Sequence, residues 1–274
     1  MLNLMYITNH PEIAQIAESA GVNRIFVDLE YIGKADRQGG MDTVQSHHTF
    51  SDVKVVSEAI TAAELLVRVN PIHEATRTYC SSKEEVDTVI SNGADIVMLP
   101  YFKTVEEVDR FLSLVDNRAK TMLLVETPEA VDAIDRILAL GNIDFVHIGL
   151  NDLSLGYGMK FMFELLADGT VEKLCAKIHE RGIPYGFGGI ASVGKGTIPA
   201  EMIIKEHYRL GSTCAILSRS FCNTEQIKHL GVISTIFLNG IREIRELEMS
   251  CKLHFDYFAE NKAELRRIVE SIVR

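Results

Sequence analysis

The sequence of 274 residues has an ordinary globular composition, with 47% hydrophobic and 24% charged residues, which is enough apolar material for a sizeable core. The formal net charge of −10 argues against a surface that binds nucleic acid, because neutralising phosphates needs clustered Lys and Arg. No apolar run approaches the roughly 18 residues that would cross a bilayer, and the N-terminus lacks the pattern of a secretory signal. The five cysteines are widely spaced and form no C-x-x-C pair, which favours reduced thiols. We therefore expect a cytoplasmic protein that binds neither nucleic acid nor a membrane.

Short apolar or β-branched runs alternate with helix-like stretches along the whole chain. The predicted strands are Leu4–Thr8, Arg24–Glu30, Leu65–Val69, Asp95–Pro100, Thr121–Glu126, Phe145–Leu150, Pro184–Gly188 and Ala215–Ser218. The predicted helices between them are Pro11–Ala20, Ser82–Ser91, Thr104–Val115, Pro128–Leu140, Val171–Arg181 and Pro199–Leu210. Continuous apolar strands are typical of sheets covered on both faces. Eight evenly spaced strand–helix units favour a closed (β/α)₈ TIM barrel of the α/β class over an open doubly wound sheet.

Two segments interrupt this alternation. The stretch Tyr31–Ala63 begins as a polar loop and becomes helix-like from about Ser51, and long loops inside compact domains are often functional. Two further helices, Thr224–Leu253 and Asp256–Arg274, are predicted after the last strand. We expect a barrel domain over residues 1–222 and a helical extension over residues 223–274. The apolar side of that extension packs on its own barrel or on a neighbouring subunit, and we expect a homo-oligomer formed through these helices.

The candidate site comes from the carboxyl ends of the strands, where the active sites of parallel barrels lie. Reading the last residues of each strand gives Asp28, Glu30, Arg68, Glu126 and Asp152. Several acids converging on one partly buried mouth need a neutralising charge. Carboxylates without a Cys or His cluster favour Mg²⁺ or Mn²⁺. Such an ion can bind a 2-oxo acid and stabilise the enolate formed beside it, and an Arg can add a fixed positive fork.

Four short motifs at these strand ends resemble the HpcH/HpaI aldolase and citrate lyase β-subunit family, within the phosphoenolpyruvate/pyruvate barrel superfamily. They are Val27-Asp-Leu-Glu30, Val67-Arg-Val-Asn-Pro71, Leu124-Val-Glu-Thr-Pro128 and Gly149-Leu-Asn-Asp-Leu-Ser154, and the resemblance covers roughly residues 1–222. It implies a metal-dependent lyase or aldolase that forms or cleaves a carbon–carbon bond next to a pyruvate-type 2-oxo acid. It also implies Glu126 and Asp152 as ligands of Mg²⁺ or Mn²⁺, and Arg68 as the residue that binds substrate and stabilises the enolate.

One position departs from the family. Its pyruvate aldolases read Asp-x-Glu-His after the second strand, where the His takes part in acid–base chemistry, whereas this chain has Tyr31. A phenol with a pKa near 10 is a poor base at neutral pH. His47 and His48, in the following loop, can supply the missing group or simply be solvated. Asp28 has two candidate roles, to orient Arg68 or the metal waters, or to form a structural salt bridge.

Two other functions remain open. A citrate-lyase-like enzyme would act on acyl-CoA substrates, and Val67-Arg-Val-Asn-Pro71 matches that branch slightly better than the aldolases. A non-catalytic barrel with a degenerate site is the third interpretation. Exchange of pyruvate methyl protons and a panel of 2-oxo acids and CoA esters would distinguish the three.

Overall fold

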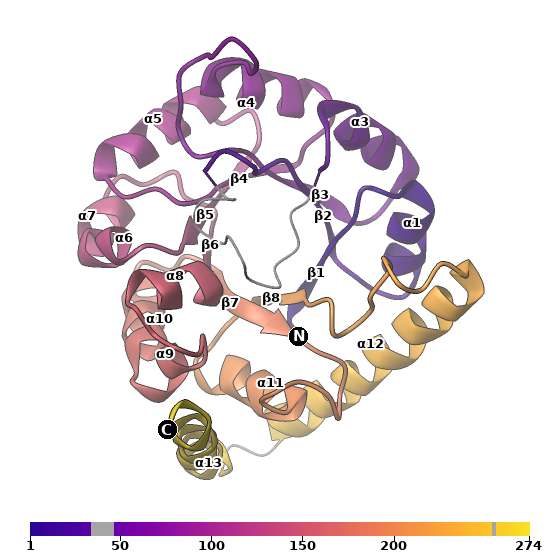
Figure 1. Cartoon of the computed structure of the whole chain (residues 1–274), viewed down its shortest axis with the longest axis vertical. Helices are drawn as coiled ribbons and strands as arrows, with labels where there is room; N and C mark the ends of the chain where they lie inside the picture. Colours follow the sequence, from indigo (N-terminus) through magenta and orange to yellow (C-terminus); the bar gives the residue numbers. More distant parts are fainter. Residues whose placement is uncertain (34–46, 254–255) are drawn as a thin grey trace.

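The computed structural model describes residues 1–33, 47–253 and 256–274. Within them, the strands form a closed barrel in the order β1 to β8, in which every neighbouring pair is parallel and β8 pairs with β1 (Figure 1). The strands are β1 Asn3–Ile7, β2 Arg24–Asp28, β3 Glu64–Arg68, β4 Ile96–Leu99, β5 Lys120–Val125, β6 Phe145–Ile148, β7 Tyr185–Ile190 and β8 Cys214–Leu217. The chain is therefore a (β/α)₈ TIM barrel with additional C-terminal helices.

The helices surround this barrel. They are α1 Pro11–Ser19, α3 Phe50–Ala59, α4 Ser82–Ser91, α5 Val105–Val115, α6 Pro128–Asp132, α7 Ile134–Leu138, α8 Leu150–Gly156, α9 Glu164–Ala167, α10 Thr170–Glu180, α11 Ala200–Arg209, α12 Leu230–Leu253 and α13 Phe258–Val273. Local sequence sets several starts, because Thr49, Ser81 and Thr104 each form a capping box with the acid three residues later. Among the described residues, no helix is sufficiently long and apolar to span a lipid bilayer.

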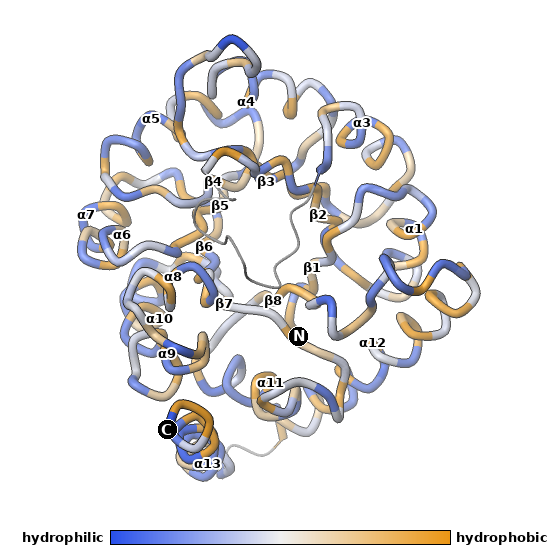
Figure 2. Tube along the Cα trace, viewed as in Figure 1, coloured by the Kyte–Doolittle hydropathy of each residue, from blue (hydrophilic) through white to orange (hydrophobic). Residues whose placement is uncertain are grey.

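The apolar residues form two cores. The larger one fills the layer between the strands and the helices, and Figure 2 shows the hydrophobic character of the strands around the centre. A second cluster fills the inside of the barrel; it consists of Met5, Phe26, Leu66, Ile96, Met98, Met122, Leu124 and Cys214. The barrel is thus packed through its centre, and a substrate site has to lie at an end of the strands.

The elements differ from the sequence-based expectation in a few places, each with a local cause. The predicted helix Pro128–Leu140 is divided into α6 and α7 at Ala133. The helix expected from Thr224 begins only at Leu230, because the side chain of Asn223 accepts hydrogen bonds from the backbone of Glu225 and Gln226 and forms a turn there. Helices α8 and α9 were not expected. Residues 34–46, the centre of the predicted loop after β2, lie outside the described residues.

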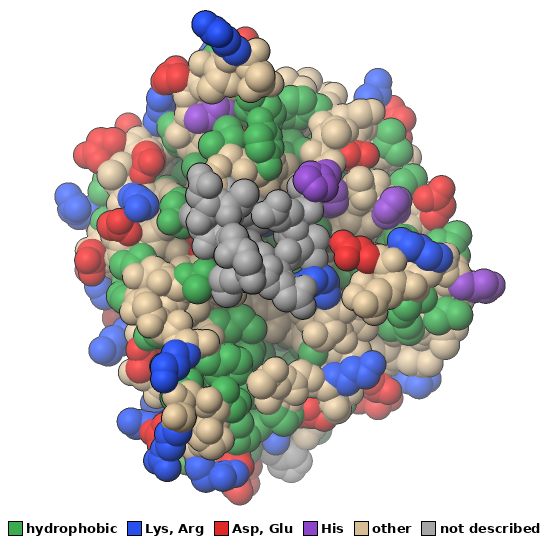
Figure 3. Space-filling view, in the orientation of Figure 1, with side chains coloured by type: hydrophobic (Ala, Val, Ile, Leu, Met, Phe, Trp, Pro, Cys, Tyr) green, Lys and Arg blue, Asp and Glu red, His purple; other side chains and the backbone are tan. Residues whose placement is uncertain are grey.

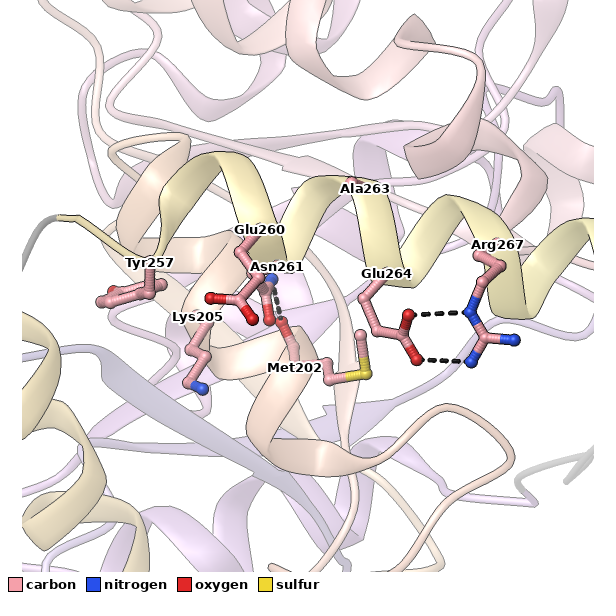
Figure 4. Close-up of a pocket in the computed structure, with 8 residues that line it drawn as sticks. All are labelled: Met202, Lys205, Tyr257, Glu260, Asn261, Ala263, Glu264 and Arg267. Atoms are coloured by element: carbon pink, nitrogen blue, oxygen red, sulfur yellow. Dashed lines mark hydrogen bonds and ion pairs between the residues drawn. The ribbon is translucent and has the colours of Figure 1, made fainter.

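The C-terminal helices pack on the barrel of the same chain. Helix α12 lies against α1 and α11, and α13 lies against α11 and α9 (Figure 1). Asn261 of α13 donates hydrogen bonds to the carbonyl of Met202 and to Glu206, both on α11, and Figure 4 shows the groove beside this contact. The division at residue 222 and the predicted subunit contact stay predictions.

Candidate active site

Arg68 forms the best-defined cluster at the carboxyl ends of the strands. Asp28 and Arg68 end neighbouring strands and are paired in the β2–β3 register. The guanidinium donates from Nε to Oδ1 of Asp28 at 2.8 Å and from Nη2 to Oδ2 at 2.7 Å, and Nη1 lies 3.3 Å from Oε2 of Glu30. Such a two-pronged contact fixes the plane of the guanidinium. Sequence reasoning selected these three residues, and the structure brings them together.

The charges around Arg68 keep it protonated. Burial alone would lower the pKa of this guanidinium, but the charges of Asp28 and Glu30, the hydrogen bonds that Arg68 donates to Asp28 and the charge of Glu126 raise it well above its usual range. Both acid partners are almost fully buried. A buried cation and two buried acids are tolerable only as a hydrogen-bonded group. Arg68 is therefore a permanent, oriented positive charge at the mouth of the barrel.

Glu126 and Asp152 lie at the ends of β5 and β6. Glu126 is 3% exposed, and its Oε1 accepts a hydrogen bond from the backbone of Tyr101 at 3.0 Å. A Cβ at Gly149 would lie 2.8 Å from Oε2 of Glu126, so only glycine leaves room for this carboxylate. Asp152, 8% exposed, lies in the first turn of α8, which starts directly after Gly149. Both carboxylates therefore belong to the same end of neighbouring strands.

These two carboxylates fit a hard divalent cation. Mg²⁺ is commonly bound through one or two carboxylates and keeps several waters, which leaves positions for a substrate. Across the described residues there is no group of three or more His, Cys, Asp or Glu side chains arranged to hold a metal ion. A closed zinc-type site needs four protein ligands, whereas Glu126 and Asp152 are the type of ligand that an open Mg²⁺ site uses.

A cavity of about 490 Å³ extends from Asp28 and Arg68 toward β1 and β8. The described residues that line it are Tyr6, Ile7, Thr8, Asn9, His10, Asp28, His47, His48, Arg68, Ile216, Leu217, Ser218, Arg219, Cys222, Asn223, Thr224, Glu225 and Lys228. On the face seen in Figure 3, histidine, acidic and basic side chains gather on the α1 side of the barrel centre. Glu126 and Asp152 are not among these lining residues. Arg68 lines the cavity, and the charge of Glu126 also acts on its pKa, so Arg68 lies between the cavity and this pair of acids.

Both candidate histidines line this cavity, but their settings differ. The backbone N–H of Asp28 donates to Nδ1 of His48 at 3.0 Å. Because an amide N–H can only donate, Nδ1 is the acceptor and neutral His48 carries its proton on Nε2. His48 is half-buried and His47 is exposed. In this arrangement neutral His48 offers a hydrogen-bond donor at Nε2.

Tyr31 lies apart from the cavity. Its ring is 48% exposed and meets the ring of Tyr79 edge-on, with centroids 5.1 Å apart. Partial burial raises the pKa of the Tyr31 phenol, and the nearby Glu85 and Cys80 raise it further. It is not among the described residues that line the cavity. Among the described residues, none gives the Tyr31 phenol the environment of a base at neutral pH.

Sequence reasoning missed a polar group behind the strand ends. Asn70 and Glu85 are both buried and hydrogen-bond each other. Asn70 belongs to the quoted motif Val67-Arg-Val-Asn-Pro71, which was the available signal. Glu85 looks like an ordinary surface acid of an amphipathic helix, so its burial could not be read from the sequence.

Two other features lie outside the candidate site. His147 is buried in the barrel, where its Nε2 donates to the carbonyl of Gly188 at 3.1 Å and burial lowers its pKa to about 4. A second hollow, of about 430 Å³, lies between α11 and α13 (Figure 4). It contains none of the candidate residues.

The structure is a (β/α)₈ barrel with buried acidic side chains at the carboxyl ends of its strands. The family model of the HpcH/HpaI aldolase/citrate lyase family matches residues 3–164. The chain therefore belongs to the HpcH/HpaI aldolase/citrate lyase family. This family consists of aldolases and lyases, which supports a lyase or aldolase function.

Solved structures support the fold. An HpcH/HpaI aldolase from Desulfitobacterium hafniense DCB-2 is 18% identical, with a TM-score of 0.61 over 89% of this chain and 93% of that one. A family protein from Burkholderia cenocepacia J2315 is 14% identical, with a TM-score of 0.62 over 82% and 91%. The citrate synthase SbnG is 15% identical, with a TM-score of 0.58 over 78% and 84%. None of the curated proteins compared with the chain matches it.

Proposed function

We propose that the protein is a divalent-metal-dependent carbon–carbon lyase or aldolase that acts on a pyruvate-type 2-oxo acid. The observation that carries this proposal is the guanidinium of Arg68, which Asp28 and Glu30 fix at the carboxyl end of β3, at the same end of the barrel as Glu126 and Asp152. A cation-binding pair of acids beside an oriented Arg suits a substrate that bears a carboxylate next to a keto group. Family membership supports the same class of reaction.

Each candidate residue has its own role in the proposed reaction. Glu126 and Asp152 would hold Mg²⁺ or Mn²⁺. When bound, that cation supplies a Lewis acid that stabilises negative charge developing on the keto oxygen. Arg68 binds the substrate carboxylate or the same oxygen, and Asp28 and Glu30 keep the guanidinium in plane. On the cavity wall, His47 moves the proton, while His48 donates a hydrogen bond from Nε2.

Exchange of the methyl protons of pyruvate in deuterated water tests this proposal. The reaction needs only the pyruvate end of the site, so no acceptor has to be known. We expect exchange that depends on added Mg²⁺ or Mn²⁺ and is absent in Glu126→Gln. If the wild-type protein with either metal exchanges no faster than buffer, the proposal is wrong, and a non-catalytic barrel becomes the better interpretation.

A substrate panel then separates the aldolase from the acyl-CoA lyase. The panel contains 4-hydroxy-2-oxo acids and CoA thioesters of hydroxy acids, each with Mg²⁺ or Mn²⁺. Cleavage of free 4-hydroxy-2-oxo acids supports the aldolase. Saturable cleavage of the thioesters alone would instead identify a citrate-lyase-like enzyme.

A further inference from the structure

A buried carboxylate lies on α4, behind the strand that carries Arg68. Glu85 is fully buried. Its Oε1 accepts hydrogen bonds from Nδ2 of Asn70 at 2.8 Å and from the hydroxyl of Tyr79 at 2.8 Å. The backbone N–H of Asn70 lies 3.2 Å from both carboxylate oxygens. Burying a carboxylate is costly unless hydrogen bonds replace its water. The described hydrogen-bond partners of the Glu85 carboxylate are Asn70 and Tyr79, and these two side chains also contact each other.

Asn70 also holds the backbone that follows β2. Its Oδ1 accepts hydrogen bonds from the backbone N–H groups of Tyr31 at 3.0 Å and Ile32 at 2.9 Å. Its Nδ2 also donates to the carbonyl of Leu29 at 3.2 Å. The side-chain amide therefore holds the backbone on both sides of Glu30. Its orientation is unambiguous, because the two N–H groups require the oxygen and the carboxylate of Glu85 requires the nitrogen.

The backbone that Asn70 holds carries the two acids that orient Arg68. The N–H of Glu30 donates to Oδ1 of Asp28 at 3.1 Å, and that oxygen also accepts from Nε of Arg68. The N–H of Leu29 donates to the carbonyl of Arg68 at 2.9 Å. A displacement of residues 29–32 would therefore move Glu30 and tilt the Asp28 carboxylate. Both changes alter the plane in which the guanidinium faces the cavity.

We propose that Asn70, held by Glu85, is a positioning residue for Arg68, an inference that rests on the substrate-binding role proposed above for that arginine. Asn70 acts through the backbone of residues 29–32 and touches no substrate. The proposed metal ligands Glu126 and Asp152 lie directly after β5 and in the first turn of α8, and none of the hydrogen bonds described above for Asn70 and Glu85 reaches them. The network should therefore govern the affinity for the 2-oxo acid and leave the affinity for the metal unchanged.

Four variants test this role. Asn70→Ala and Glu85→Ala break the network. Glu85→Gln preserves most of it, because the amide oxygen can still accept from Tyr79 and Asn70. Glu206→Ala is the matched control, since Glu206 is an equally buried helix carboxylate that holds Arg209 and Asn261 instead. Each variant is characterised by its melting temperature, its Mn²⁺ affinity, and KM and kcat for metal-dependent pyruvate proton exchange.

We expect the two network-breaking variants to raise KM for pyruvate and lower kcat, together by about 10- to 100-fold in kcat/KM, as a misplacement of about 1 Å can cost. Their Mn²⁺ affinity should stay within about twofold of wild type. Glu85→Gln should recover most of the activity. Glu206→Ala should melt earlier and retain normal kinetics at temperatures well below its melting point. If Asn70→Ala behaves like Glu206→Ala, the inference is overturned.

A second measurement does not depend on activity. The Nε–H of Arg68 is bonded to Asp28, so its NMR signal should exchange slowly with water in the wild type and in Glu206→Ala. It should exchange faster in folded Asn70→Ala. Unchanged exchange in Asn70→Ala would refute the positioning role. Absence of pyruvate exchange in the wild type, together with the expected NMR change, would count against the proposed function alone.

Discussion

At the scale of single residues, the site depends on two acids that the fold holds close to glycine backbone. The Glu126 carboxylate lies against Gly149, and Asp152 follows within the same turn of α8. We predict that Glu126→Gln and Asp152→Asn each abolish activity and weaken Mn²⁺ binding, since removing a ligand forfeits several kcal/mol of transition-state stabilisation. Pyruvate proton exchange measures the activity, isothermal titration measures Mn²⁺ binding, and thermal melts check that the variants stay folded. Near-normal metal affinity in both variants would show that these residues are not the ligands.

The acid–base group is the second prediction at this scale. Tyr31→Phe should be mild, because the pKa of this phenol is raised and its ring packs on Tyr79 outside the described cavity wall. His47→Gln should cost roughly 10²-fold, the usual scale of general acid–base catalysis. The rate of metal-dependent pyruvate proton exchange in the wild type and in His47→Gln measures this loss. Full activity in the double His47/His48 variant would exclude both histidines.

At the scale of elements, the strands could be predicted closely and the site only in part. Buried parallel strands are continuous apolar runs, so each predicted strand lies within about two residues of the observed one. Because strand ends share one edge, Asp28, Glu30 and Arg68 could be grouped from sequence, and the structure shows their ion pairs. Residues that act through long-range contacts carry no local pattern. Glu85 is buried by the packing of α4, and Lys228 lines the cavity from the segment between the Asn223 turn and α12.

The interior of the barrel gives a prediction about pH. Burial lowers the pKa of His147 on β6 to about 4, whereas a histidine in an unfolded chain titrates near 6.5. Below about pH 6.5 the unfolded chain therefore binds a proton that the folded chain does not. The free energy of unfolding consequently falls as the pH decreases toward 4. At about 1.4 kcal/mol per unit, His147 accounts for on the order of 3 kcal/mol of this loss. Above pH ~6.5, His147 is neutral in both the folded and the unfolded chain, so none of this stability is lost there.

Urea unfolding of wild type and His147→Gln across this pH range measures the effect. Burial also lowers the pKa of His207, to about 3, so the variant should keep part of the pH dependence and lose about one proton of the slope. The glutamine amide can still donate to the carbonyl of Gly188, which keeps the variant folded. An identical slope in both proteins would show that His147 is already protonated in the folded state.

At the scale of the whole molecule, α12 connects the start of the chain with α11. Glu248 of α12 is fully buried and accepts hydrogen bonds from the backbone of Leu2 and the hydroxyl of Tyr208. Arg245 donates to the carbonyl of Leu2 and to Glu248. These contacts fix the inner side of α12 on the first strand and on α11. The outer side of the helix is thereby presented away from the barrel.

We propose that copies of the chain associate through this outer side of α12. Leu238, Met249 and Leu253 are 55%, 54% and 71% exposed, and their spacing of eleven and four residues places them along one stripe of the helix. The exposed ion pair of Arg242 and Glu246 lies between Leu238 and Met249 on this side, so the proposed contact is both apolar and charged. A stable interface needs roughly 1,000 Å² in total. Light scattering after gel filtration should therefore give a mass above the 30.6 kDa of one chain.

The double variant Leu238→Glu/Met249→Glu should shift the mass toward the monomer, because two buried carboxylates would face each other across the contact. Val55→Glu is the matched control, since Val55 is an exposed apolar residue on α3 and its replacement should leave the mass unchanged. A monomeric wild type at tens of micromolar, or an unchanged mass in the double variant, would contradict the proposed contact.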